Sequence, residues 1–331
     1  MRLPDFQYMA PKSMQEASLF LKDHGKESKI MSGGTDILPS MKQKIFRPRY
    51  LVHLDGISDL SRIEFDEKSG LRIGALVRLR ALEKDLAILE RYPIIKEAVI
   101  RIGSVQIRQM GTVGGNLCLD TRCYYYNQSS FWRSCRPRCI KMGGEICNAV
   151  GGGKKCFAVF SGDLAPAFIA LGAKIKLLSA SGERTLLLSD FYTGDGEKPL
   201  ALNPEEILTR VEVPSIPKDT FNTYFKYRIR KSIDFPIASL AVLLTLAGKE
   251  RTCREVKMVV GAVGSKPEEV KEIEELLKGK EIKNPIIEEA SDLAFKAAKP
   301  IANAASSPAY RKRMIKVFAG RALKQALGRE M

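Results

Sequence analysis

Apolar positions in the first hundred residues recur with alternating helical and strand periods. Ser13-Met14-Gln15-Glu16 is a capping box, and apolar residues follow it at helical spacing until Gly25, where the helix is expected to end. Further on, short apolar runs are typical of buried strands and longer amphipathic runs of helices. We therefore predict strands over residues 29–31, 50–54 and 71–75 and helices over residues 79–89 and 92–102.

The second half of the chain repeats this mixture. Pro214–Asp219 is polar and carries two prolines, which is typical of a linker between two regions. The longest apolar run, Ile237–Ala247, is too short to span a bilayer and suits a buried strand. The pattern predicts helices over residues 164–171 and 268–277 and strands over residues 173–178, 238–246 and 256–263.

A last helix is expected to begin at Ser307-Pro308, because serine is a good N-cap and proline suits the first helical position. Gly328 is expected to end it. The helical period places the apolar face of this helix at Tyr310, Met314, Val317, Phe318 and Leu323.

Composition narrows the setting of the protein. The N-terminus has no signal-peptide pattern, and the chain has no apolar run of membrane-spanning length, so we predict a cytoplasmic protein. Seven cysteines, an odd number, argue against a complete disulfide framework there. The net charge is +16, with a local basic excess in residues 118–157. Such a balance suits nucleic acid, a membrane surface or an acidic partner.

Two glycine loops are candidate phosphate sites. Ser32-Gly33-Gly34-Thr35-Asp36 follows a predicted strand, and Gly111-Thr112-Val113-Gly114-Gly115-Asn116 lies some eighty residues later. Backbone N–H groups in such loops can point at a phosphate, and two loops can clasp a pyrophosphate from opposite sides. The spacing fits neither the dinucleotide fingerprint nor a P-loop.

Four cysteines form the other candidate site: Cys123, Cys139, Cys147 and Cys156. The four cysteines are not arranged in the closely spaced pairs of common zinc sites, nor in the C-x2-C-x2-C run of bacterial ferredoxins. Their spacing therefore favours a metal site but does not indicate which metal. Iron–sulfur groups carry negative charge, which nearby cations would offset, namely Arg133, Arg136, Arg138 and Lys141. Cys118 and Cys135 are spare thiols, and Cys253 is interpreted as a buried small residue.

The sequence argues against a zinc protease and against a hydrolase with a nucleophile elbow, because the chain has neither an H-E-x-x-H nor a G-x-S-x-G motif. A zinc-stabilised nucleic-acid-binding protein would account for the charge and the cysteines. It would leave both glycine loops unused, and the chain supplies no aromatic-rich RNA motif.

The loops, together with Ser161-Gly162-Asp163-Leu164-Ala165-Pro166-Ala167, resemble the FAD-binding subunit of the xanthine dehydrogenase (molybdenum hydroxylase) family. Phe225–Arg230, Asp234–Ala238 and Ser307–Arg313 are similar to that family's C-terminal flavoprotein domain. The resemblance implies an α+β chain: a two-subdomain FAD-binding domain of the vanillyl-alcohol-oxidase/PCMH type and a C-terminal α/β domain. The implied boundaries are residues 1–217, with subdomains of about 1–55 and 56–217, and residues 218–331.

Residues 118–157 resemble an insertion found in one branch of the family, the β subunit of 4-hydroxybenzoyl-CoA reductase. That likeness implies a [4Fe-4S] cluster held by Cys123, Cys139, Cys147 and Cys156. It further implies electrons that pass from a ferredoxin-like donor through this cluster and FAD. They end in the reductive removal of an aromatic hydroxyl, a step of anaerobic aromatic degradation. A xanthine, aldehyde or carbon monoxide dehydrogenase-type hydroxylase is the alternative within the family.

The resemblance also implies the partners and the FAD contacts. The partners are a large molybdopterin subunit and a small subunit with two [2Fe-2S] clusters, assembled as a dimer of heterotrimers, without nucleic acid or a membrane span. The chain itself would be an electron relay with no catalytic residue. The implied FAD contacts are Lys29, Ile30, Met31, Ser32, Gly33, Gly34, Thr35, Asp36, Ile102, Thr112, Val113, Gly114, Gly115, Asn116, Asp163, Leu208 and Lys226.

Overall fold

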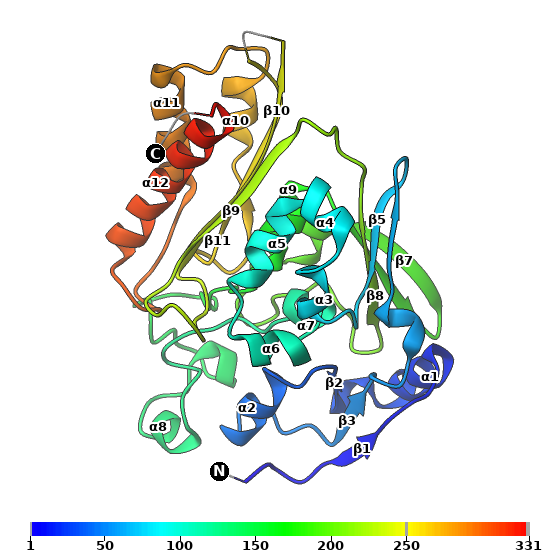
Figure 1. Cartoon of the computed structure of the whole chain (residues 1–331). Helices are drawn as coiled ribbons and strands as arrows, with labels where there is room; N and C mark the ends of the chain where they lie inside the picture. Colours follow the sequence, from blue (N-terminus) through cyan, green and yellow to red (C-terminus); the bar gives the residue numbers. More distant parts are fainter. Residues whose placement is uncertain (1, 249–250, 329–331) are drawn as a thin grey trace.

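The computed structural model describes residues 2–248 and 251–328 and arranges them around three sheets (Figure 1). The N-terminal sheet is parallel, in the order β1 (Gln7–Met9), β3 (Tyr50–His53) and β2 (Ser28–Met31). The serine cap of the predicted capping box is confirmed at α1 (Met14–His24), where the Ser13 side chain accepts the Glu16 N–H. The reciprocal contact is shifted, since Glu16 accepts the N–H of Lys12, one residue before the N-cap. Helix α2 (Ile37–Lys42) follows the first glycine loop.

The middle sheet is antiparallel. Its order is β4 (Ile63–Asp66), β5 (Gly70–Gly74), β8 (Ile207–Val213), β6 (Lys174–Ser179) and β7 (Gly182–Leu187). Six helices belong to this lobe: α3 (Leu79–Leu82), α4 (Leu86–Arg91), α5 (Pro93–Ile100), α6 (Val105–Met110), α7 (Val113–Leu117) and α9 (Leu164–Ala170).

The single helix predicted over residues 79–89 is wrong, since two helices, α3 and α4, occupy that stretch. The reason is Asp85, whose carboxylate accepts the Ile88 N–H at 3.1 Å and begins a new helix. An aspartate in this position satisfies a free N–H at a helix start, and that interrupts an otherwise continuous apolar period.

The C-terminal sheet is antiparallel, in the order β12 (Glu268–Glu269), β11 (Thr252–Gly261), β10 (Ala238–Ala247) and β9 (Phe221–Tyr227). Helices α10 (Lys271–Leu277), α11 (Asn284–Ala297) and α12 (Pro308–Ala326) follow it in sequence. Because the strands come first and the helices afterwards, this region is α+β, and the expected α/β class is wrong for it. The helix expected from residue 268 starts at Lys271, since Glu268 and Glu269 pair with β11.

The C-terminal sheet is buried on both faces. Ala241, Leu243 and Val259 pack into the core beneath α5 and α9, whereas Leu240, Val242 and Leu244 pack under α10–α12 (Figure 1). A strand covered on both faces reads as a continuous apolar run, which explains the stretch Ile237–Ala247. Among the described residues, no helix is long and apolar enough to cross a membrane.

The buried face of α12 differs from the expected one. Tyr310 is 45% exposed, whereas Arg311 is fully buried and shares its face with Ile315, Phe318 and Leu323. The Arg311 guanidinium donates to the carbonyls of Ile237, Ala262 and Ile301, and burial lowers the pKa of Arg311 to about 10. The face shifts by one residue because these carbonyls satisfy a charged side chain inside the core.

Residues 118–157 contain little regular structure. They hold a short helix, α8 (Ser130–Ser134), and a single 3-10 turn, Ile140–Met142. Arg122 and Val159 exchange two backbone hydrogen bonds, of 2.7 and 2.8 Å, and so close the segment at its base. Figure 1 shows α8 projecting below the C-terminal lobe, on the side of α2 away from the parallel sheet.

Candidate cofactor site and cysteine cavity

The two glycine loops meet although eighty residues separate them in sequence. The Ser32 and Thr112 hydroxyls are hydrogen-bonded at 2.8 Å. A Cβ added at Gly33 would lie 1.8 Å from the Met110 carbonyl oxygen, so only glycine permits this approach. A Cβ at Gly115 would lie 3.0 Å from the Thr112 hydroxyl and 3.1 Å from that of Ser32. Gly115 therefore faces the junction of the loops.

The second loop is the start of a short helix. Thr112 caps α7 by accepting the Gly115 N–H at 3.1 Å. Gly114 donates to the Ala75 carbonyl at 2.8 Å, and Asn116 accepts the Leu164 N–H at 3.0 Å. Val113, Gly114 and Asn116 are buried, so they anchor the loop in the core, and Gly115 is the residue that remains exposed.

The first loop continues β2. Ile30, Met31, Ser32, Gly33 and Gly34 are half-buried, and Thr35 is exposed. Lys29 places its ammonium 4.8 Å from the centroid of the Phe46 ring, and Asp36 pairs with Arg122 at 3.2 Å. Burial raises the pKa of Asp36, and the neighbouring Arg122 opposes that rise.

His53 was missed as a loop residue by sequence reasoning. Its Nε2 lies 3.1 Å from the Ser32 carbonyl, and its Nδ1 lies 2.7 Å from the Tyr8 hydroxyl. Both ring nitrogens are thus used to hold the first loop against the parallel sheet. A lone histidine at a strand end carries no sequence signal for such a contact, because Tyr8 is 45 residues away.

Asp163 and Lys226 are brought together inside the protein. The Lys226 ammonium lies 3.1 Å from the Asp163 carboxylate and also donates to the carbonyls of Arg101 and Asp234. Tyr224 donates to the same carboxylate at 2.8 Å. Burial raises the pKa of Asp163 and lowers that of Lys226, and each partner opposes the shift of the other. All three ammonium protons are used within the chain, so the predicted contact with FAD would need another atom of these residues.

Ile102 and Leu208, the remaining predicted FAD contacts, are 8% and 6% exposed. Both belong to the core of the middle lobe. Arg108 fixes the chain beside Ile102 by donating to its carbonyl at 2.8 Å while pairing with Glu83. Their contact with FAD stays a prediction.

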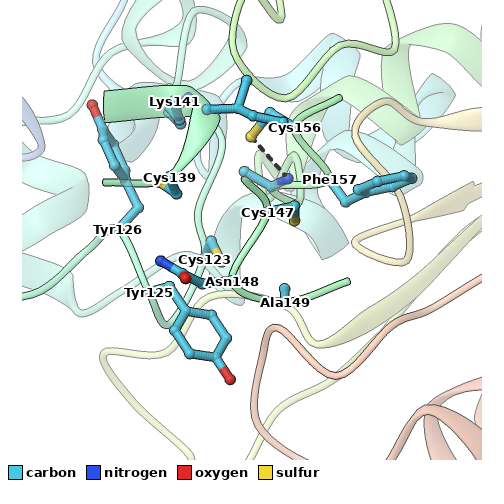
Figure 2. A pocket seen from close by; sticks show the side chains of 12 residues that line it. Cys123, Tyr125, Tyr126, Cys139, Lys141, Cys147, Asn148, Ala149, Cys156 and Phe157 are labelled. Atoms are coloured by element: carbon cyan, nitrogen blue, oxygen red, sulfur yellow. Dashed lines mark hydrogen bonds between the residues drawn. The ribbon is translucent and has the colours of Figure 1, made fainter. Parts of the chain in front are cut away.

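The four predicted cysteine ligands line one cavity (Figure 2). Cys139 and Cys156 are buried, Cys123 and Cys147 are half-buried, and all four thiols are free. The Ala158 N–H points at the Cys156 sulfur, 3.5 Å away. The spare thiols are elsewhere: Cys118 packs against the core, and Cys135 is exposed, 3.4 Å from the Phe131 carbonyl. Cys253 is 1% exposed in β11, as expected of a buried small residue.

The donor set suits a thiophilic group. Burial raises the pKa of Cys123 to about 11, and the three other cysteines add to this rise because their thiolates repel it. Burial also raises the pKa of Cys156, whereas the Ala158 N–H and the Lys141 ammonium act to lower it. A metal that binds here would replace the thiol protons. Within the described ranges, no three His, Cys, Asp or Glu side chains are grouped closely enough to hold a single metal ion.

Two family models account for most of the sequence. Residues 4–216 match the FAD-binding domain of molybdopterin dehydrogenases, and residues 223–326 match the C-terminal domain of the carbon monoxide dehydrogenase flavoprotein. The chain belongs to the FAD-binding subunits of the molybdenum hydroxylase family. It is therefore an oxidoreductase subunit, and the resemblance seen in its loops is confirmed at the family level. The alternative of a nucleic-acid-binding protein is not supported, since both matched regions are parts of oxidoreductases.

Relatives agree with this membership. The chain is 32% identical to the FAD-binding subunit of an Escherichia coli aldehyde oxidoreductase, over 72% of this chain and 76% of the relative. It is 26% identical to the glyceraldehyde dehydrogenase medium chain of Sulfolobus acidocaldarius, over 97% and 98%. A solved structure of carbon monoxide dehydrogenase from Oligotropha carboxidovorans superposes with a TM-score of 0.81 at 28% identity and covers each chain fully.

An FAD-binding subunit needs a place where backbone approaches the pyrophosphate closely, and the chain offers one. Gly115 is exposed at the junction of the loops, and a Cβ there would crowd the Ser32 and Thr112 hydroxyls. We call this junction the cradle. These residues fit FAD, and they would hold its phosphates between the two loops.

Proposed function

We propose that this chain is the electron-transfer subunit of a heteromeric molybdenum enzyme of the xanthine, aldehyde or carbon monoxide dehydrogenase type. Its partners would be a large molybdopterin subunit and a small subunit with two [2Fe-2S] clusters, assembled as a dimer of heterotrimers. The relatives above are subunits of dehydrogenases and an aldehyde oxidoreductase. They favour this type over the predicted 4-hydroxybenzoyl-CoA reductase-like enzyme. The substrate would bind on the molybdenum subunit.

The observation that carries this proposal is the junction of the glycine loops, with Ser32 and Thr112 in contact at 2.8 Å. FAD supplies exchange of one and two electrons, which suits a junction between one-electron carriers. The chain's share is to bind and orient the cofactor. His53 holds the first loop, and the buried Asn116 holds the second, so contacts within the chain fix both sides of the cradle.

Substitution of Gly115 tests the cradle. A Gly115→Val side chain would project against the Ser32 and Thr112 hydroxyls, so the purified protein should lose most of its bound flavin, measured by absorbance and by release of FAD. Gly151→Val is the matched control, because a Cβ there meets nothing within 4 Å. Full flavin content in a folded Gly115→Val protein would contradict the proposed site.

The cysteine cavity favours a second electron carrier in the same subunit, a [4Fe-4S] cluster held by Cys123, Cys139, Cys147 and Cys156. The supporting observation is that four free thiols from a 34-residue stretch line one cavity. With such a carrier, a reductase-like enzyme is the second candidate function: a ferredoxin-like donor would deliver electrons to this subunit. The observation that favours it is the single cavity lined by four free thiols. The basic excess of the segment would attract an acidic donor.

Iron and acid-labile sulfide in the anaerobically purified protein test the cluster. We expect about four of each per chain, since [4Fe-4S] sites use four cysteine thiolates. Cys147→Ser should lower both contents, whereas Cys135→Ser should leave them unchanged because that thiol is exposed outside the cavity. Zinc without sulfide would show a structural metal in place of an electron carrier.

A further inference from the structure

Lys141 is a buried cation at the edge of the cysteine cavity. It lies two residues after Cys139, lines the cavity (Figure 2), and its side chain is only 4% exposed. Its ammonium donates to the Asp120 carboxylate, the Thr121 hydroxyl and the Gly196 carbonyl, each at 2.6 Å. Three fixed acceptors use all three donors, so the charge cannot swing away from the cavity.

Two other basic side chains of the segment, Arg133 and Arg136, are directed to other partners. Arg133 donates to the carbonyls of Gln43 and Lys44, at 3.1 and 3.2 Å, and so ties the segment to the end of α2. Arg136 stacks over Trp132, 4.5 Å from the ring centroid. Among the described residues of 118–157, Lys141 is the only cation that lines the cavity.

We propose that Lys141 is a positioning residue that raises the reduction potential of an iron–sulfur cluster bound by the four cysteines. The inference rests on the cluster proposed above. Reduction of such a cluster would add one electron, taken from the ferredoxin-like donor or from dithionite in the test below, and would form or break no bond. A fixed cation beside a partly desolvated anionic group stabilises the more negative, reduced form.

Asp120 supplies the opposite charge and predicts an opposite effect. It pairs with Lys141, and its backbone neighbour Thr121 donates an N–H to it at 2.9 Å. Asp120→Asn keeps an acceptor oxygen for both contacts but removes the negative charge. The positive charge of Lys141 would then act on the cluster with less compensation, so the reduction potential should rise.

The test is a redox titration of the full-length protein with dithionite and mediators, followed by the electron paramagnetic resonance signal of the reduced cluster. Lys141→Met should lower the reduced-to-oxidised ratio at a fixed ambient potential by about tenfold, which is about 59 mV for a one-electron couple. Lys154→Met is the matched control, because Lys154 is an exposed cation of the same segment that solvent and salt screen. It should change the ratio by less than about twofold.

The controls separate the two proposals. Absence of iron and sulfide from the unsubstituted protein would overturn the cluster and this inference together. With the cluster present, a Lys141→Met potential equal to that of Lys154→Met would overturn the role of Lys141 alone. If Lys141→Met loses its cluster, Asp120→Asn decides: a raised potential supports the role, and an unchanged or lowered one overturns it.

Discussion

At the scale of single residues, the Lys226–Asp163 pair joins the lobes of the protein. Asp163 precedes α9 in the middle lobe, Lys226 lies in β9 of the C-terminal sheet, and the Arg101 carbonyl that Lys226 binds follows α5. The side chains are 0% and 4% exposed. A buried pair of this kind has paid a desolvation cost, so its loss on one side leaves an uncompensated charge.

Lys226→Met should therefore lower the free energy of unfolding by about 3–5 kcal/mol, since the Asp163 carboxylate would lose its ion pair and keep only the Tyr224 hydroxyl as a hydrogen-bond partner. Urea denaturation measures this difference. The double variant Lys226→Met/Asp163→Asn should lose less than Lys226→Met alone, because it buries no unpaired charge. A single-variant loss below about 1 kcal/mol would show that the pair is not a strong link.

At the scale of elements, the sequence pattern predicted strands and helices where a stretch is dominated by one kind of residue. The run Ile237–Ala247 predicted β10, and Ser307-Pro308 predicted the start of α12, where the Ser307 side chain accepts the Tyr310 N–H. Arg311 could not be predicted to be buried, because a charged residue belongs on the surface unless distant carbonyls satisfy it. Its acceptors lie at Ile237, Ala262 and Ile301, and no local pattern brings them together.

The residues of the candidate sites likewise divide into those that the sequence could predict and those that it could not. Glycine and cysteine are informative in sequence because few other residues can do what they do, so both loops and the four cysteines could be predicted as groups. From the sequence alone, the basic residues near the cysteines could not be distinguished from one another. Four cations were expected to offset the cluster, and the structure directs Arg133 and Arg136 to other partners. Which cation faces the cavity depends on Asp120, Thr121 and Gly196, and the last of these is 55 residues away.

At the scale of the whole molecule, the C-terminal sheet is shared by two cores. Alternate residues of β10 enter the core of the middle lobe and the core beneath α10–α12. The linker expected at residues 214–219 separates β8 from β9, but the lobes on either side of it bury apolar surface against each other. Two regions that match different family models should on this ground unfold together.

Leu243 and Leu244 test this cooperativity as a neighbouring pair. Leu243 faces the middle lobe and is 3% exposed, and Leu244 faces the C-terminal helices and is 0% exposed. Calorimetry of the full-length protein should show one transition, and Leu243→Ala and Leu244→Ala should each destabilise it by about 2–5 kcal/mol. Independent lobes would give two transitions, and Leu244→Ala would then lower the temperature of only the transition that belongs to the C-terminal helices. Flavin content must be matched between samples, because a ligand bound to the folded protein raises the transition temperature by mass action.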